Sequence, residues 1–185
     1  MDGEVRMGWN GWRVARWGIA TALLLTPAVM MQVSDDWNWG PASFLLAGVM
    51  IFGPILAYER TARLWPNLAY RGGVATALVV SFLLIWINLA VGILGEGNPI
   101  NFSFFLLVMA SGVGAFAARL RPDGMARAMF GTAVMQGLLA LAIATAPSAA
   151  NEPRGAAGAL VLCGFFAAMW LVSAALFHKA SREGR

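Results

Sequence analysis

Charge is what this sequence lacks most. Only 12% of its 185 residues are Asp, Glu, Lys or Arg, whereas a soluble domain carries about 25%. Six stretches hold no charged residue at all, and they cover residues 17–34, 37–58, 72–95, 97–118, 128–151 and 155–177. A helix needs roughly 20 apolar residues to cross a bilayer, and its backbone amides must bond within the helix. The sequence therefore predicts an all-α polytopic membrane protein with six transmembrane helices, in a single integral membrane domain over residues 1–185.

Cysteine and histidine are nearly absent, with one of each, Cys163 and His178. A single cysteine excludes an intrachain disulfide and a cysteine metal cluster. A single histidine excludes a haem held between two histidines of this chain. No phosphate-binding loop, zinc signature or Ser/His/Asp set is present, and no ionisable residue lies near the middle of a predicted span, where it would mark a proton relay or voltage sensor. We therefore predict no catalytic residue, no metal and no cofactor, and the sequence favours a role other than an enzyme.

The few basic residues are distributed unevenly. If all six runs span the membrane, twelve of the thirteen Lys and Arg residues fall on one side, and only Arg154 falls on the other. Basic residues stay on the cytoplasmic side because their translocation is unfavourable. The sequence therefore predicts cytoplasmic N- and C-termini. The basic clusters are short and lie beside the spans, which indicates contact with the lipid bilayer and no binding of nucleic acid. Glu59, beside Arg60 and Arg63, predicts an interfacial ion pair.

The first span also has features of a secretory signal, with Arg13 and Arg16 before an apolar run and small residues at 26–28. Cleavage after Ala28 would leave five helices with the C-terminus still inside. The apolar run continues beyond Pro27, which favours a retained transmembrane helix.

One phrase occurs three times in the chain. An arginine is followed by Thr-Ala at the fifth and sixth positions in "RWGIATALLL" (16–25), "RGGVATALVV" (71–80) and "RAMFGTAVMQ" (127–136). The intervals are 71 − 16 = 55 and 127 − 71 = 56 residues, a period typical of a repeated supersecondary unit. This predicts three hairpins of parallel orientation, at about residues 13–63, 69–121 and 124–182. Two explanations stay open: a threefold duplication about an axis along the membrane normal, or the positive-inside spacing of unrelated hairpins.

Polar side chains within the spans are interpreted first as interhelical hydrogen-bonding groups. Gln32 follows Arg16 by 16 residues and Asn88 follows Arg71 by 17, so at about 1.5 Å per residue both lie at a similar depth near the outer face. The alternative hypothesis is an outward-facing polar pocket, which could hold a cation through oxygen ligands. Its members would be Gln32, Asp35, Asp36, Asn38, Asn88, Glu96, Asn98 and Asn101.

Small and aromatic residues predict how the helices pack. The segment "SGVGA" (111–115) predicts a tight helix crossing, because small residues let helices approach closely. Trp86 and Trp170 lie deeper than the other tryptophans. Two roles stay open for them, filling the core or contacting a lipid or pigment.

Three stretches resemble an uncharacterised family of small bacterial multi-pass integral membrane proteins. They are "MMQVSDDWNWGPASFLLAG" (30–48), "WINLAVGILGEGNPIN" (86–101) and "ARLRPDGMARAMFGTA" (118–133). The chain departs from the family's pattern at Ser43, where an acidic residue is common, and at Trp37, where the usual residue is aliphatic. The resemblance implies a protein of the bacterial inner membrane and brings no activity with it.

Three functional classes compete. An accessory or structural subunit of a membrane complex fits the short loops and the lack of deep charges best. A small transporter or channel with an outward-facing polar pocket is the alternative, and parallel repeats favour it. A lipid-acting enzyme would need a polar constellation at an interface, which the sequence does not show. Besides lipid, the sequence leaves open association with other membrane subunits or with further copies of the chain.

Overall fold

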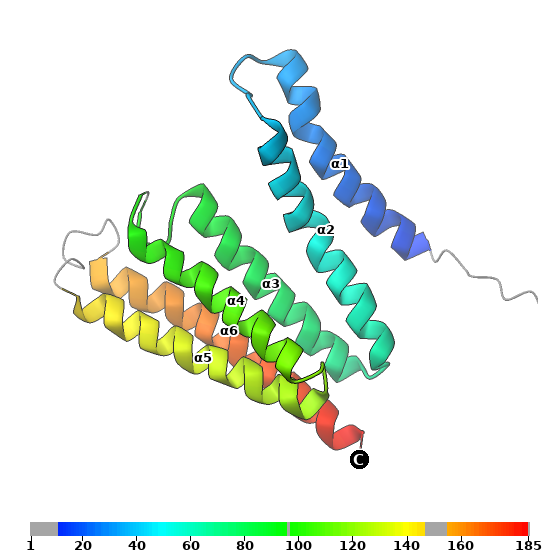
Figure 1. Cartoon of the computed structure of the whole chain (residues 1–185), viewed down its shortest axis with the longest axis vertical. Helices are drawn as coiled ribbons and strands as arrows, with labels where there is room; N and C mark the ends of the chain where they lie inside the picture. Colours follow the sequence, from blue (N-terminus) through cyan, green and yellow to red (C-terminus); the bar gives the residue numbers. More distant parts are fainter. Residues whose placement is uncertain (1–10, 96, 147–154, 185) are drawn as a thin grey trace, which may run out of the picture. The chain divides into compact units, whose positions relative to one another are not determined.

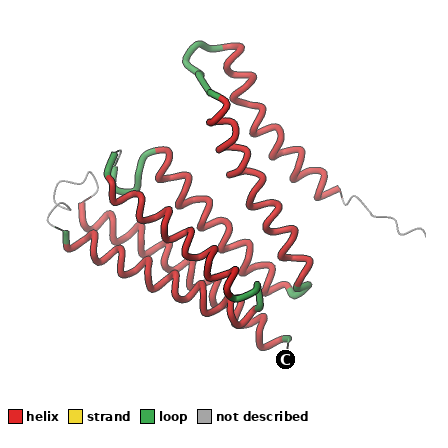
Figure 2. Tube along the Cα trace, in the orientation of Figure 1, coloured by secondary structure: helices red, strands yellow, loops and turns green. Residues whose placement is uncertain are grey.

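The fold is built from α-helices throughout the part of the chain that the structure describes. The computed structural model describes residues 11–95, 97–146 and 155–184 (Figure 1). Its helices are α1 (Gly11–Val33), α2 (Pro41–Leu64), α3 (Leu68–Ala90), α4 (Phe102–Ala117), α5 (Pro122–Thr145) and α6 (Gly155–Glu183), with the 3-10 helix η1 (Pro99–Asn101) before α4. All six spans, with η1 counted in the fourth, are long and apolar enough to cross a membrane, and Figure 2 shows no strand in the described ranges. The chain is therefore a multi-pass helical membrane protein, as predicted.

Several helices continue beyond the uncharged runs into the basic segments. α2 continues through Glu59 and Arg63, whose side chains lie 3.9 Å apart and confirm the predicted ion pair. α6 continues through Lys179 and Glu183, which form a second pair at 3.8 Å. Long basic side chains keep their stems against apolar surface and their charges in the polar layer, so a helix does not have to end where charge begins. The uncharged runs therefore locate the spans but not the helix ends.

The chain divides into two compact units, Met1–Leu56 and Ala57–Arg185. The first contains α1 and the larger part of α2, and the second contains the end of α2 together with α3 to α6. The single domain over the whole chain stays a prediction.

Aromatic contacts join α1 to α2 in the first unit. The Trp17 ring stacks on Phe52, with 5.6 Å between the ring centroids. In the connection between the helices, the centroids of Trp37 and Trp39 lie 6.3 Å apart. α1 continues without interruption through Pro27, as the apolar run predicts. Ring stacking of this kind adds to the apolar burial of the hairpin.

The second unit is a ring of four helices. α4 packs against α3 and α5, and α6 packs against α5 and α3. Figure 1 shows these helices running side by side, and consecutive helices joined by short connections are typical of helical bundles. The centre is filled by large side chains that are less than 2% exposed, among them Tyr70, Leu84, Phe104, Phe166, Trp170 and Phe177. Bulky apolar groups therefore occupy the axis of this unit.

The two deep tryptophans lie in different environments. Trp170 is 0% exposed and fills the core of the second unit. Trp86 is 50% exposed on α3 and stacks on Phe82, with 6.0 Å between the centroids. Of the two roles that the sequence leaves open, Trp170 thus has the core role, whereas Trp86 lies on the outer surface of α3.

α3 and α6 approach closely at the start of the phrase "RGGVATALVV". A Cβ atom at Gly73 would lie 3.1 Å from the Phe177 ring, and the Ser173 hydroxyl donates a 2.8 Å hydrogen bond to the Gly73 carbonyl oxygen. The Phe177 ring also meets the Tyr70 ring edge to face, with centroids 5.1 Å apart. The glycine is needed here because a side chain would push these two helices apart.

α4 and α5 cross tightly where "SGVGA" predicts a crossing. A Cβ atom at Gly114 would lie 3.0 Å from the Cβ of Ala128. The turn that follows places Arg119 and Leu120 at φ 49° and 55°, in the left-handed region that non-glycine residues seldom adopt. The Tyr70 hydroxyl donates a 2.9 Å hydrogen bond to the Leu120 carbonyl oxygen. This bond from α3 therefore holds a strained turn in place.

The three copies of the repeated phrase have different environments. Thr21 is exposed, Thr76 is half-buried and Thr132 is only 3% exposed. Thr76 and Thr132 donate hydrogen bonds of 2.9 and 3.0 Å to carbonyl oxygens four residues earlier in their own helices. Sequence similarity at these positions therefore does not bring equal packing, and the threefold duplication and its axis stay predictions.

Candidate functional site

The proposed polar pocket has four members in the first unit. Gln32 lies at the end of α1, and Asp35, Asp36 and Asn38 lie in the connection to α2; all four side chains are exposed. The Ser34 hydroxyl lies 3.3 Å from both the carboxylate and the backbone nitrogen of Asp36. This is a local turn contact that uses one of the carboxylates.

The members in the second unit mainly build the connection between α3 and α4. Asn101 is 9% exposed, and its amide accepts from the Leu94 N–H at 3.0 Å and donates to the Gly95 carbonyl at 2.7 Å. Asn88 donates to the Leu84 carbonyl oxygen at 2.7 Å.

Asn98 accepts a 2.9 Å hydrogen bond from the Ile100 N–H and so begins η1. Glu96 lies outside the described residues. Gly92 has φ 66°, and a Cβ atom there would overlap the Asn101 amide, so the loop requires glycine at this point. The asparagine amides therefore hold backbone groups of the loop, and the polar pocket stays a prediction.

Polar side chains in the spans mostly bond within their own helices. Ser81 and Ser111 donate to carbonyl oxygens four and three residues earlier, at 2.9 and 2.7 Å. Two hydroxyls bond outside their own helices. The Ser173 hydroxyl reaches α3, which confirms an interhelical hydrogen bond, and the Tyr70 hydroxyl reaches the turn after α4. Ser and Thr hydroxyls within a helix commonly donate to a backbone carbonyl oxygen of the preceding turn. The Ser81 and Ser111 hydroxyls have thus each used their one donor within their own helix.

Gln136 differs from the other polar residues of the spans. It is 0% exposed on α5, and neither its amide nitrogen nor its amide oxygen has a hydrogen-bond partner of ordinary geometry. The Cys163 thiol of α6 lies beside it and is a weak partner. The indole nitrogen of Trp170 is likewise buried without a partner. The sequence shows only that Gln136 is polar, whereas the packing of α5 against α6 shows that its buried amide has just a thiol beside it.

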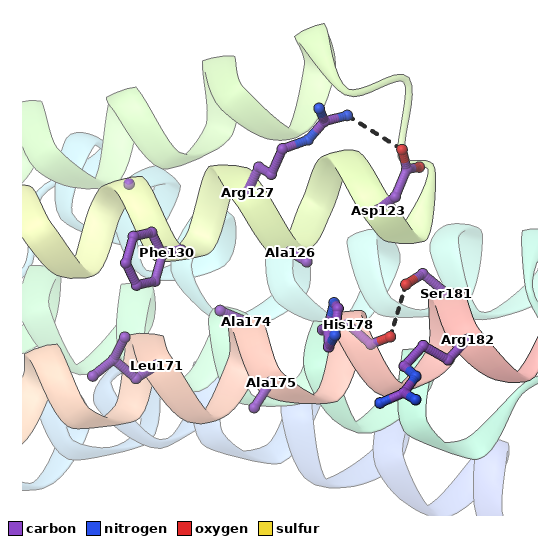
Figure 3. Close-up of a pocket in the computed structure, with 11 residues that line it drawn as sticks. Asp123, Ala126, Arg127, Phe130, Leu171, Ala174, Ala175, His178, Ser181 and Arg182 are labelled. Atoms are coloured by element: carbon purple, nitrogen blue, oxygen red, sulfur yellow. Dashed lines mark hydrogen bonds and ion pairs between the residues drawn. The ribbon is translucent and has the colours of Figure 1, made fainter.

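A groove of about 820 Å³ lies between α5 and α6 at the arginine-bearing end of the second unit (Figure 3). Its polar part is formed by Asp123, Arg127, His178, Ser181 and Arg182, and its apolar part by Ala126, Phe130, Gly131, Leu171, Ala174 and Ala175. Figure 3 shows the His178 ring between the two helices, and Arg127 turned toward Asp123 at the rim. The guanidinium and carboxylate of that pair are 3.2 Å apart. The groove is therefore polar at the helix ends and apolar along the helices.

This groove could not be found from the sequence. There, Arg127 and Arg182 are basic residues at the ends of spans, and His178 is a residue near a helix C-terminus, where it suits a mildly favourable dipole contact. A helical wheel would have put Arg127, Phe130 and Gly131 near one another on α5, because positions three and four apart share a face. Which face of α6 they oppose depends on tertiary packing.

Among the described ranges, no three His, Cys, Asp or Glu side chains gather closely enough to hold a metal ion. Comparison of the chain with protein-family models, with curated proteins and with solved structures finds no match.

Proposed function

We propose that this protein is an accessory subunit of a membrane complex in a bacterial inner membrane, with both termini in the cytoplasm. The one-sided distribution of Lys and Arg supports the orientation. The three stretches that resemble small bacterial membrane proteins support the bacterial origin, and membership of that family is part of the proposal.

The observation that carries the accessory role is the local bonding of polar groups in the second unit. Thr76, Ser81 and Thr132 all donate to carbonyl oxygens of their own helices. The axis between the helices is occupied by buried aromatic side chains such as Phe104 and Trp170. A transport path needs polar or ionisable groups facing a shared cavity, so a packed bundle of this kind is better suited to a structural role.

Small residues on outer helix faces support the same proposal. Gly164 and Ala168 are both exposed on α6, one helical turn apart, and a Cβ atom at Gly164 would meet nothing within 4 Å. Gly112 on α4 is exposed and has the same open surroundings. In membranes, small residues four apart allow a second helix to approach closely. The α6 face with Gly164 and Ala168 can therefore accept a helix of another subunit, and Gly112 adds an open position on α4.

The test is to isolate the tagged full chain in native lipid particles and to quantify the proteins that accompany it. We expect one or more other membrane polypeptides at a fixed ratio to the chain. Gly164→Leu and Gly112→Leu change an outer face without altering the core, and at least one of them should lower that ratio. If no membrane polypeptide accompanies the chain at a fixed ratio, the accessory role is wrong.

The alternative function is a small transporter or channel, and the isolated amide of Gln136 is the observation that favours it. A conducting protein would show solute or ion flux when the purified chain is reconstituted alone in liposomes, and Gln136→Met would abolish that flux without loss of folded protein. The accessory role predicts no flux from either form.

Orientation has its own test, which is a reporter enzyme fused after Arg185. A reporter that is active only in the periplasm should be inactive in this fusion. Activity would contradict the cytoplasmic C-terminus.

A further inference from the structure

The groove between α5 and α6 changes from charged to apolar along the helix axes. Asp123, Arg127 and Arg182 lie toward the helix ends, and Phe130 and Leu171 lie farther along the helices (Figure 3). Leu171 and Arg182 are eleven positions apart on α6, so they are separated by roughly 16 Å along the helix at 1.5 Å per residue. That length is about half of the ~30 Å hydrocarbon core. The groove thus matches one leaflet, with its charged end at the polar surface.

Two arginines at the charged end are available to an anion. Arg182 forms no ion pair with any residue of the described ranges, and it is exposed near the end of α6. Arg127 pairs with Asp123, but the two side chains are 81% and 54% exposed, so the pair contributes little and can rearrange. His178 and Ser181 lie on the same rim. Guanidinium groups recognise phosphate oxygens through paired N–H donors.

The apolar end of the groove does not fit a small inorganic anion. Phe130 of α5 and Leu171 of α6 lie at the apolar end of the groove, and Ala174 and Ala175 of α6 line it between Leu171 and His178. Phe130 is 57% exposed and Leu171 is 45% exposed, so both have apolar surface free for contact. A free phosphate ion would use the arginines and leave this surface uncovered. A phospholipid would fill both parts, because its acyl chain runs parallel to the helices from a headgroup at the interface.

We propose that this groove binds one anionic phospholipid, with its phosphate near Arg127 and Arg182 and an acyl chain along Phe130 and Leu171. Two positive groups at a membrane surface favour anionic over zwitterionic lipid. The proposal requires only that α5 and α6 span the membrane, and it is independent of the accessory role and of which side the arginines face.

The test uses the purified full chain, stripped of lipid in mild detergent, with phosphatidylglycerol or phosphatidylcholine of identical acyl chains. Native mass spectrometry then counts the lipids that each chain retains. We expect one phosphatidylglycerol per chain, retained at least about fivefold better than phosphatidylcholine. The variant with both Arg127→Gln and Arg182→Gln should lose about tenfold or more of that retention. Arg71→Gln removes a charge at the start of α3, outside the groove, and should change retention little.

A second pair of variants tests the apolar part without changing charge. Ala175→Trp adds bulk to the groove lining, whereas Ala142→Trp adds the same bulk at an exposed position of α5 outside the groove, twelve residues beyond Phe130. We expect phosphatidylglycerol retention to fall in the first variant only. Equal retention of the two lipids, an equal loss in Arg71→Gln, or unchanged retention in Ala175→Trp would each overturn the proposal. Displacement of the lipid by inorganic phosphate alone would do so too, because it would show a site for a free anion.

Discussion

The Ser173 hydroxyl donates a 2.8 Å hydrogen bond to the carbonyl oxygen of Gly73, and this bond joins α6 to α3 across one hundred residues of sequence. Both residues are buried. The phrase "RGGVATALVV" that marks the start of a hairpin in the sequence is thus also the place where the second unit closes its ring of helices.

Gly73→Ala should destabilise the folded protein at this crossing. The added methyl group would lie 3.1 Å from the Phe177 ring, which is fully buried and has little room to move. Overpacking of this kind costs about 1–3 kcal/mol. Gly72→Ala is the matched control, because its methyl group would lie at an ordinary 3.5 Å from the flexible Leu176 side chain. Thermal unfolding in detergent, monitored by circular dichroism, should give a lower midpoint temperature for Gly73→Ala than for Gly72→Ala. Equal midpoint temperatures would contradict the close approach of α3 and α6 at Gly73.

Asn101→Asp should destabilise the loop between α3 and α4. The carboxylate could still accept from the Leu94 N–H, but it could not donate to the Gly95 carbonyl, and it would bring charge to a site that is 9% exposed. A buried group without its partner costs about 1–3 kcal/mol, and more when charge is involved. Asn38→Asp, on an exposed connection, is the control and should leave the unfolding midpoint unchanged. A midpoint for Asn101→Asp as high as that of the control would show that the amide does not hold the loop.

Arg119→Gly should stabilise the turn between α4 and α5, because φ 49° costs a non-glycine residue about 1–2 kcal/mol. Arg119→Ala removes the same charge but keeps the Cβ atom, so the difference between the two variants isolates the backbone effect. We expect the glycine variant to unfold at the higher denaturant concentration. The reverse order would show that the left-handed conformation carries no cost in this turn.

Gln136→Met should be neutral or stabilising by about 1 kcal/mol, since a buried amide whose polar atoms lack an ordinary partner carries a penalty of about 1–3 kcal/mol. Methionine has a similar length and adapts to irregular space. The measurement is the unfolding midpoint of the purified protein, and Gln136→Leu gives a second apolar replacement. A clear loss of stability in both variants would mean that the amide has a partner in the membrane.

The six spans could be predicted from the sequence because each transmembrane helix must satisfy its own backbone, which requires a long uncharged run. The helix ends could not be predicted in this way. Arg63 and Glu183 lie within helices since their side chains reach polar surroundings, and α3 ends at Ala90 because Gly92 and Asn101 build a specific loop. Charge counts do not contain that information.

The contacts that each polar side chain makes could not be predicted from the sequence either. Asn88 and Gln136 look alike as amides within apolar runs, yet Asn88 bonds to the Leu84 carbonyl, whereas Gln136 has only the weak Cys163 thiol beside it. The lipid groove likewise depends on α5 and α6 presenting Arg127 and Arg182 to the same surface. These features follow from which helix faces meet, and a single sequence shows the periodicity of a face but not its neighbour.

The most direct test of the accessory role is the mass of the intact particle. Native mass spectrometry of the full chain, released from native lipid particles, should give a complex whose mass exceeds that of this chain by at least one different membrane polypeptide in a fixed ratio. A particle containing only this chain, as a monomer or with further copies of the chain, would contradict the account.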